Sequence, residues 1–325
     1  MTKVAAQRSA FQMAPPGVIE RAYDNPEEVW HLIEAGAPYK SITAVQKEPV
    51  GTAAAPWFRN FWALGGRVIF PGAESVFSNG RFIEAAQETF RAEVIQPLAM
   101  MTNLNAPAPA APPHLDLPFF RGAHQREVPL WMLAPMGYSG LFQRWAIPVA
   151  SVITWFYAGE GGEFEYWPEG LDGPSAKAAN LSSNQGVVAD NEYMYHRVCQ
   201  IGREHEFLPD NEIPYEAMLR RTDSGWQITA NDLVLGEYEP GGIRASVLWK
   251  AYCFKDQAEA DAFTSGADSL SPELIVEIFQ KDLKARGIRC DYPDNLEGKD
   301  DWSRIVREHY SALDSASAQG RHGSE

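Results

Sequence analysis

The feature of this sequence that most constrains its fold is a series of short apolar runs between residues 150 and 254. The runs are rich in Val, Ile, Tyr, Phe and Trp, and Gly, Pro, Asn or Asp separates them. Such runs favour strands, and the separating residues favour turns. Many short strands joined by turns are typical of a β-sandwich or a β-barrel. The runs are ASVITWFYA, GEFEYWP, QGVVAD, YMYHRV, WQI, LVLGEY and IRASVLWKAYCF.

Helical patterns lie on both sides of this β-rich region. Before it, NPEEVWHLIEAG predicts one helix, and apolar residues recur every four positions through SNGRFIEAAQETFRAEVIQP, which Pro97 limits. After it, SPELIVEIFQKDLKARG has Ser271 as an N-cap, and DDWSRIVREHYSAL predicts a last helix. The sequence therefore predicts a mainly β protein with flanking helices packed outside one β core.

Charge and cysteine content exclude several classes of protein. The net charge is −15, so contacts with nucleic-acid phosphates are unfavourable and nucleic acid is not an expected partner. The three cysteines form no CxxC pair, which argues against a disulfide framework and favours a reducing compartment. No apolar run has the length of a membrane span, and the first residues lack the apolar segment of a signal peptide. We expect a cytoplasmic protein without a membrane partner.

The stretch PPHLDLPFF, residues 112–120, places a histidine and an aspartate inside an apolar run. Burying these polar side chains costs free energy unless a partner such as a metal ion satisfies them. Residues two apart on a strand point to the same side, so His114 and Asp116 would face together and Leu115 would face away. A proline-flanked surface turn is the alternative interpretation.

A third metal ligand would have to come from a neighbouring strand. His196 stands out among the seven histidines because it lies in the β-type run NEYMYHRVCQIG. Two histidines and one carboxylate on one face leave open positions on a metal, which suits Fe(II) in oxygen-activating enzymes. A histidine satisfied within the core is the alternative for His196, and these residues alone leave both interpretations open.

The order of the motifs resembles the Fe(II)/2-oxoglutarate-dependent oxygenases over roughly residues 110–255. In that superfamily a double-stranded β-helix, a cupin-like jelly roll, carries HxD, a Gly-Gly-acidic turn, a distal histidine and R-x-S. Here HLD is followed by GGEFEYWP, by HRV and by RAS. The resemblance implies that His114, Asp116 and His196 hold Fe(II).

The resemblance also implies the groups that bind the co-substrate 2-oxoglutarate. Arg244 and Ser246 match the R-x-S motif, whose basic residue binds the far carboxylate of the co-substrate. The planar fork of an arginine matches a carboxylate with two hydrogen bonds. Thr154 and Tyr157, on the run SVITWFYA, are further candidates to donate a hydrogen bond to the co-substrate.

The position of this arginine departs from the family pattern. The arginine usually follows the distal histidine closely, whereas Arg244 lies 48 positions after His196. Residues 202–241 would then be an insertion with a helix and two strands. Arg203 is nearer but lies in the charged run QIGREHEF, which has no strand pattern. We prefer Arg244 and keep Arg203 as the alternative.

The expected organisation is a single domain over residues 1–325. Residues 17–105 would form an N-terminal helical support, residues 110–255 the jelly-roll catalytic core, and residues 256–313 the C-terminal helices. The flanking helices leave a homodimer open.

The resemblance implies an oxidoreductase that uses Fe(II), 2-oxoglutarate and O2 to oxidise a small molecule, with hydroxylation as the default outcome. An aromatic lining would suit an apolar or aromatic substrate. One alternative is a cupin-like metal-dependent oxygenase that does not use 2-oxoglutarate, and another is a non-catalytic jelly-roll protein that binds a ligand. The candidate lining residues are Phe119, Phe120, Trp131, Phe142, Trp145 and Trp167.

Overall fold

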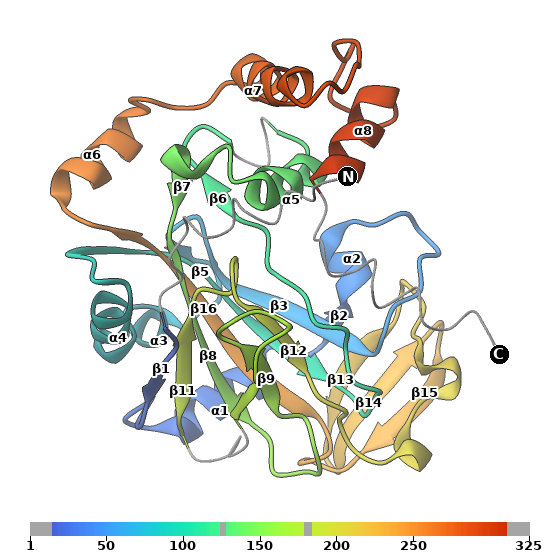
Figure 1. The fold of residues 1–325 in the computed structure, drawn as a ribbon. Helices are drawn as coiled ribbons and strands as arrows, with labels where there is room; N and C mark the ends of the chain where they lie inside the picture. Colours follow the sequence, from blue (N-terminus) through green and yellow to red (C-terminus); the bar gives the residue numbers. More distant parts are fainter. Residues whose placement is uncertain (1–14, 124–127, 179–183, 311–325) are drawn as a thin grey trace. The chain divides into compact units, whose positions relative to one another are not determined.

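The computed structural model falls into two compact units, each with its own core (Figure 1). The structure describes residues 15–123, 128–178 and 184–310. We call the larger one the sheet unit and the smaller one the helical unit. The sheet unit consists of the described residues within 14–115 and 149–253, and the helical unit of those within 116–148 and 254–310.

An antiparallel sheet of eleven strands, which we call the large sheet, is the main feature of the sheet unit (Figure 1). Its strand order is β1-β11-β8-β16-β5-β3-β2-β13-β14-β15, and β4 pairs with β3. The strands are β1 (Gly17–Ile19), β2 (Tyr39–Ser41), β3 (Trp57–Leu64), β4 (Arg67–Val68), β5 (Val94–Asn105), β8 (Val149–Phe156), β11 (Gly186–Ala189), β13 (Met218–Thr222), β14 (Gly225–Ala230), β15 (Leu233–Tyr238) and β16 (Arg244–Phe254).

A small sheet consists of β10 (Ala176–Ala178), β9 (Phe164–Trp167) and β12 (Tyr195–Val198), in that order. A proline-rich segment, residues 108–114, lies along the free side of β12. Every third residue of this segment donates its backbone N–H to this edge: Ala108 to Ile201, Ala111 to Val198 and His114 to His196, each at 3.0 Å. A spacing of three suits an extended proline-rich chain, which has three residues per turn.

The chain alternates between the two sheets in the manner of a double-stranded β-helix. It passes from β5 in the large sheet to the proline-rich segment in the small one, then to β8, back to β9 and β10, to β11, to β12 and finally to β16. The spatial orders are β11-β8-β16-β5 and β10-β9-β12-segment. This is the strand order of a jelly roll with eight members. The predicted fold class is confirmed.

The stretch PPHLDLPFF is not a regular strand, contrary to our expectation. His114 forms an isolated antiparallel bridge with His196, and only Phe119–Phe120 (β6) is a strand further on. Pro112 and Pro113 have no backbone N–H, so they cannot take part in a continuous ladder. The segment therefore follows the sheet through single bridges.

The two faces of the large sheet differ because side chains alternate along each strand. On β16, Val247, Trp249 and Ala251 belong to the main hydrophobic core. Helices cover this core face with buried residues from α1 (Pro26–Ala35), α3 (Glu74–Phe77) and α4 (Gly80–Phe90). The opposite face, which we call the inner face, carries Arg244 and Ser246 on β16. Trp155 of β8, also on the inner face, has its ring 5.8 Å from that of Phe164 in the small sheet.

The range 17–105 is less helical than we predicted. Its helices are α1, α2 (Ile42–Gln46), α3 and α4, but β5 and β3 also fall within it. Helix α4 ends at Phe90 because Arg91 adopts a left-handed conformation with φ of 52°. Val94, which we placed on the helix, begins β5. Strand β5 is covered on both faces through much of its length, so it lacks the alternation that marks a half-buried strand.

The insertion at 202–241 extends the large sheet rather than forming a helix and two strands. Strands β13, β14 and β15 continue the sheet beyond β2 through hairpins. Among the residues described there, the helical pieces are two 3₁₀ turns, Glu204–Glu206 and Pro209–Asn211.

The helical unit packs its own aromatic core. Its helices are α5 (Leu130–Ser139), α6 (Gln257–Ser265), α7 (Pro272–Ala285) and α8 (Asp301–His309), with a 3₁₀ turn at Gln143–Trp145 and the strand pair β6 and β7 (Ala146–Ile147). Phe142 and Phe279 lie 4.9 Å apart between ring centroids, and Phe120 is also buried there. Trp131 and Trp145 pack against the same core. Most of the aromatic residues that we proposed as a substrate lining therefore stabilise this unit.

Among the described helices, none combines the length and the apolar character needed to cross a bilayer.

Candidate metal centre and co-substrate site

His114 and His196 face each other across the edge of the small sheet. Each donates its backbone N–H to the other's carbonyl oxygen at 3.0 Å, which makes them a hydrogen-bonded antiparallel pair. Side chains of such a pair lie on the same face. The imidazole ring centroids are 4.5 Å apart, with an angle of 55° between the ring planes. Residues 82 positions apart in the chain thus present two imidazoles at one place.

The backbone orients both imidazole rings in the same way. Nδ1 of His114 lies 3.1 Å from the carbonyl oxygen of Pro112, and Nδ1 of His196 lies 3.0 Å from that of Met194. A carbonyl oxygen only accepts, so each Nδ1 carries the proton and donates it. Nε2 of each ring then keeps its lone pair for a metal. This outer contact is the one that metal-binding histidines usually make.

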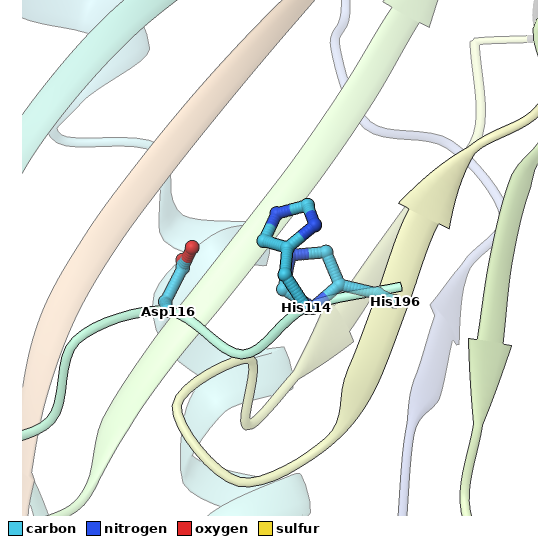
Figure 2. Close-up of side chains that lie close together, drawn as sticks. All are labelled: His114, Asp116 and His196. Carbon is cyan, nitrogen blue, oxygen red and sulfur yellow. The ribbon is translucent and has the colours of Figure 1, made fainter. Parts of the chain in front are cut away.

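Asp116 completes a group of three metal-binding side chains (Figure 2). One ligand atom from each of His114, Asp116 and His196 lies within 4.8 Å of the others, the single such group among the described residues. A metal with bonds of about 2.1 Å spans ligands up to about 4 Å apart. The group therefore needs at most a small side-chain rotation to close on one ion.

The burial of the three ligands differs. His196 is buried, with its ring centroid 5.5 Å from that of Phe164, whereas Asp116 is half-buried and His114 is exposed. Apolar surroundings on one side and access on the other are what a metal needs if it is to bind further ligands. Two imidazoles and one carboxylate form the donor set of oxygen-activating Fe(II) sites. The residues present fit such an ion.

Arg244 is a buried cation at the start of β16, with 2% of its surface exposed. Burial lowers the pKa of its guanidinium to about 10, so the group stays charged at neutral pH. Its Nε donates to the carbonyl oxygen of Gly162 at 2.6 Å. No acidic side chain in the described part of the chain forms an ion pair with it. A buried charge of this kind is stabilised by a bound anion.

The glycine pair of GGEFEYWP makes room for this arginine. Gly162 has φ of 74°, and a Cβ atom there would lie 2.9 Å from Cδ of Arg244. Gly161 is equally constrained, because a Cβ atom there would lie 2.1 Å from the carbonyl oxygen of Gln200. The motif is thus explained by steric space and by the carbonyl group that orients Arg244.

Ser246 and Trp155 lie beside Arg244 on the inner face. Ser246 is buried and follows Arg244 by two residues, so both side chains point the same way. Ser246 pairs in register with Trp155 of β8. The buried Nε1 of Trp155 has no hydrogen-bond acceptor among the described residues. A ligand with carboxylate oxygens would suit this donor as well as the guanidinium.

The structure separates the other two predicted co-substrate residues. Tyr157 is buried, donates its hydroxyl to the carbonyl oxygen of Glu160 at 3.0 Å, and its ring lies near Gly162. Thr154 points to the core face, where its hydroxyl lies 2.7 Å from that of Tyr23. The site that we propose below therefore keeps Tyr157 and leaves Thr154 out.

Arg203, the alternative to Arg244, is exposed and pairs with Glu160 at 2.7 Å. Two other residues near the site escaped our sequence analysis, namely Lys250 and Glu192. Lys250 is on the inner face of β16, six residues after Arg244. A lysine inside the apolar run IRASVLWKAYCF, in phase with Arg244, was the signal available.

Known structures with a similar fold are oxygenases, at low sequence identity. An oxidoreductase of the 2OG-Fe(II) oxygenase family from Burkholderia pseudomallei is 15% identical, with 74% of this chain and 86% of that chain covered and a TM-score of 0.38. A prolyl-4-hydroxylase from Pseudomonas putida is 10% identical, with 75% and 94% covered and a TM-score of 0.37. A prolyl hydroxylase from Trichoplax adhaerens is 9% identical, with 76% and 86% covered and a TM-score of 0.38.

No protein family model matches the sequence, and no curated protein sequence matches it. Because the TM-scores of the similar structures lie below 0.5, we base the fold on the strand order of this chain. The function is likewise inferred from its own residues.

Proposed function

We propose that this protein is a non-haem Fe(II)/2-oxoglutarate-dependent oxygenase that hydroxylates a small molecule. His114, Asp116 and His196 would hold the metal, and Arg244, with Ser246 and Tyr157 beside it, would bind the co-substrate. The single observation that carries the proposal is the meeting of His114, Asp116 and His196 within 4.8 Å. When bound, Fe(II) and 2-oxoglutarate together activate O2 for oxidation of a substrate C–H bond.

The protein residues have separate tasks in this reaction. The carbonyl oxygens of Pro112 and Met194 keep the protons on Nδ1 of the two histidines, so that Nε2 faces the metal. The guanidinium of Arg244, oriented by Gly162, would pair with the far carboxylate of 2-oxoglutarate. The low polarity around Arg244 strengthens that pair relative to water.

The nature of the substrate stays a prediction. The aromatic lining that favoured an apolar or aromatic molecule is largely absorbed by the core of the helical unit. Trp167 lies outside that core, with the guanidinium of Arg197 5.4 Å from the centre of its ring.

The proposal is tested by titrating the anaerobic protein with Fe(II) and then with 2-oxoglutarate. The chelate has a weak visible metal-to-ligand charge-transfer band. We expect the band in the wild type, its loss in Asp116→Ala, and a higher 2-oxoglutarate requirement in Arg244→Ala. Arg203→Ala is the matched control, because Arg203 is exposed, and should behave as the wild type.

Other outcomes would favour the alternatives. Iron binding without the band would indicate a jelly-roll oxygenase that does not use 2-oxoglutarate. Absence of iron binding would refute the metal site and favour a non-catalytic ligand-binding protein. An effect of Arg203→Ala in place of Arg244→Ala would move the co-substrate site.

A further inference from the structure

A buried ion pair lies on the inner face of the large sheet. Nζ of Lys250 on β16 lies 2.7 Å from Oε1 of Glu192, and their side chains are 10% and 1% exposed. Such a pair contributes little to stability, because desolvation of both charges offsets their attraction. Its retention in the interior suggests that it fixes a position.

Glu192 belongs to a tight turn that connects β11 to β12. The carbonyl oxygen of Asp190 accepts the backbone N–H of Tyr193 at 3.1 Å and that of Met194 at 2.8 Å. The turn therefore moves as one piece. Through Glu192, Lys250 ties this piece to β16, which lies in the other sheet from β12.

The last residue of the turn touches a proposed metal ligand. The carbonyl oxygen of Met194 accepts the proton on Nδ1 of His196 at 3.0 Å. The place of this carbonyl group decides which way the imidazole ring faces and which nitrogen keeps its lone pair. Lys250, Glu192, Met194 and His196 thus form a continuous chain of contacts.

We propose that Lys250 and Glu192 are positioning residues for the metal centre. Their ion pair holds the turn, and the turn holds His196 in the orientation that a metal requires. This inference rests on the proposed function, because it presupposes a metal at His196. Apolar residues of similar volume would fill the same space but would not fix the direction of the turn.

The test compares metal binding with folding stability in the full-length protein. In the double variant Lys250→Met with Glu192→Leu, no charge of the pair is left buried alone. We expect its thermal unfolding without metal to stay close to that of the wild type, and its Co(II) affinity to fall by roughly 10- to 100-fold. The ligand-field absorption of bound Co(II) should change as well, which loss of stability alone would not cause.

The control removes another ion pair of the sheet unit. Arg221 lies 2.9 Å from Glu34, and this pair joins β13 to α1. The double variant Arg221→Met with Glu34→Leu should keep the Co(II) affinity and absorption of the wild type. Loss of Co(II) affinity in this control as well would overturn the specific role of Lys250 and Glu192.

A second comparison keeps the inference testable if the first double variant does not fold. Glu192→Gln keeps an oxygen that accepts from Lys250, whereas Glu192→Ala does not. We expect Co(II) affinity close to the wild type in Glu192→Gln and a marked loss in Glu192→Ala. Equal affinity and equal absorption in these two variants, or in the folded double variant and the wild type, would overturn the positioning role. Failure of the wild type to bind Co(II) would instead refute the proposed function.

Discussion

Arg244 and Gly162 fit together as donor and acceptor and as bulk and space. Nε of Arg244 donates to the carbonyl oxygen of Gly162 at 2.6 Å, and the missing side chain of Gly162 leaves room for the arginine chain. The arginine is therefore held in one orientation before any ligand arrives. A cation held in this way loses little freedom when it binds a carboxylate.

This relationship predicts the effect of Gly162→Ala. The new Cβ atom would lie 2.9 Å from Cδ of Arg244 and would displace the guanidinium. Loss of one hydrogen bond to a charged group costs about 1.5–3 kcal/mol, so the dissociation constant for 2-oxoglutarate should rise roughly tenfold or more. Titration of the Fe(II) protein with 2-oxoglutarate measures it.

Gly170→Ala is the control for Gly162→Ala. Gly170 has a similar φ of 85°, but a Cβ atom there would meet nothing within 4 Å. Both variants carry the backbone strain of a left-handed residue, about 1–2 kcal/mol. Only Gly162→Ala should weaken 2-oxoglutarate binding. An equal loss in both variants would separate Gly162 from the co-substrate site.

Metal binding should stabilise the folded protein. A ligand that binds only the native state at 100 times its dissociation constant adds about 2.7 kcal/mol to the free energy of unfolding. Co(II) should therefore raise the melting temperature of the wild type but not that of His196→Ala. His205→Ala, which changes an exposed histidine outside the group of three, should respond as the wild type. A response retained in His196→Ala would contradict the assignment of this ligand.

Asp190 should make stability depend on pH. Burial, followed by the nearby charge of Glu192, raises the pKa of its carboxyl well above the ordinary value of 3.8. The native state then keeps a proton that the unfolded chain has released, so stability falls as the pH rises above about 4, until the native carboxyl has ionised. Asp190→Asn removes this titration. Its free energy of unfolding relative to the wild type should increase with pH.

Urea unfolding of the metal-free protein between roughly pH 4 and pH 8 would measure this difference. Asp223→Asn, at an exposed aspartate of the same unit, is the control and should follow the wild type. Parallel stability curves for Asp190→Asn and the wild type would show that the carboxyl of Asp190 ionises alike in the native and unfolded states.

The core face of the large sheet should be sensitive to truncation at Phe82. This side chain is fully buried, and its ring centroid lies 5.8 Å from that of Trp249. Phe82→Ala should lower the free energy of unfolding by about 3–5 kcal/mol. Phe90→Ala, at the half-buried end of the same helix, should cost less. Equal costs measured by urea unfolding would mean that α4 does not pack on the sheet as described.

The local pattern of the sequence was sufficient for most strands and helices. The runs LVLGEY and IRASVLWKAYCF coincide closely with β15 and β16, because turn residues bound each of them. Helix α7 starts where Ser271 caps it through the backbone N–H of Leu274. Strand β5 was missed, since burial on both faces removes the alternation that distinguishes strands from other apolar runs.

The sequence by itself determined the residue types of the site and their order, from His114 and Asp116 to His196 and Arg244. It also determined that the prolines before His114 prevent a regular strand, although we did not draw that conclusion. Only the tertiary structure brought the two histidines together, because their pairing joins segments 82 positions apart. The pairing of Lys250 with Glu192 is likewise a product of sheet topology, which no local pattern encodes.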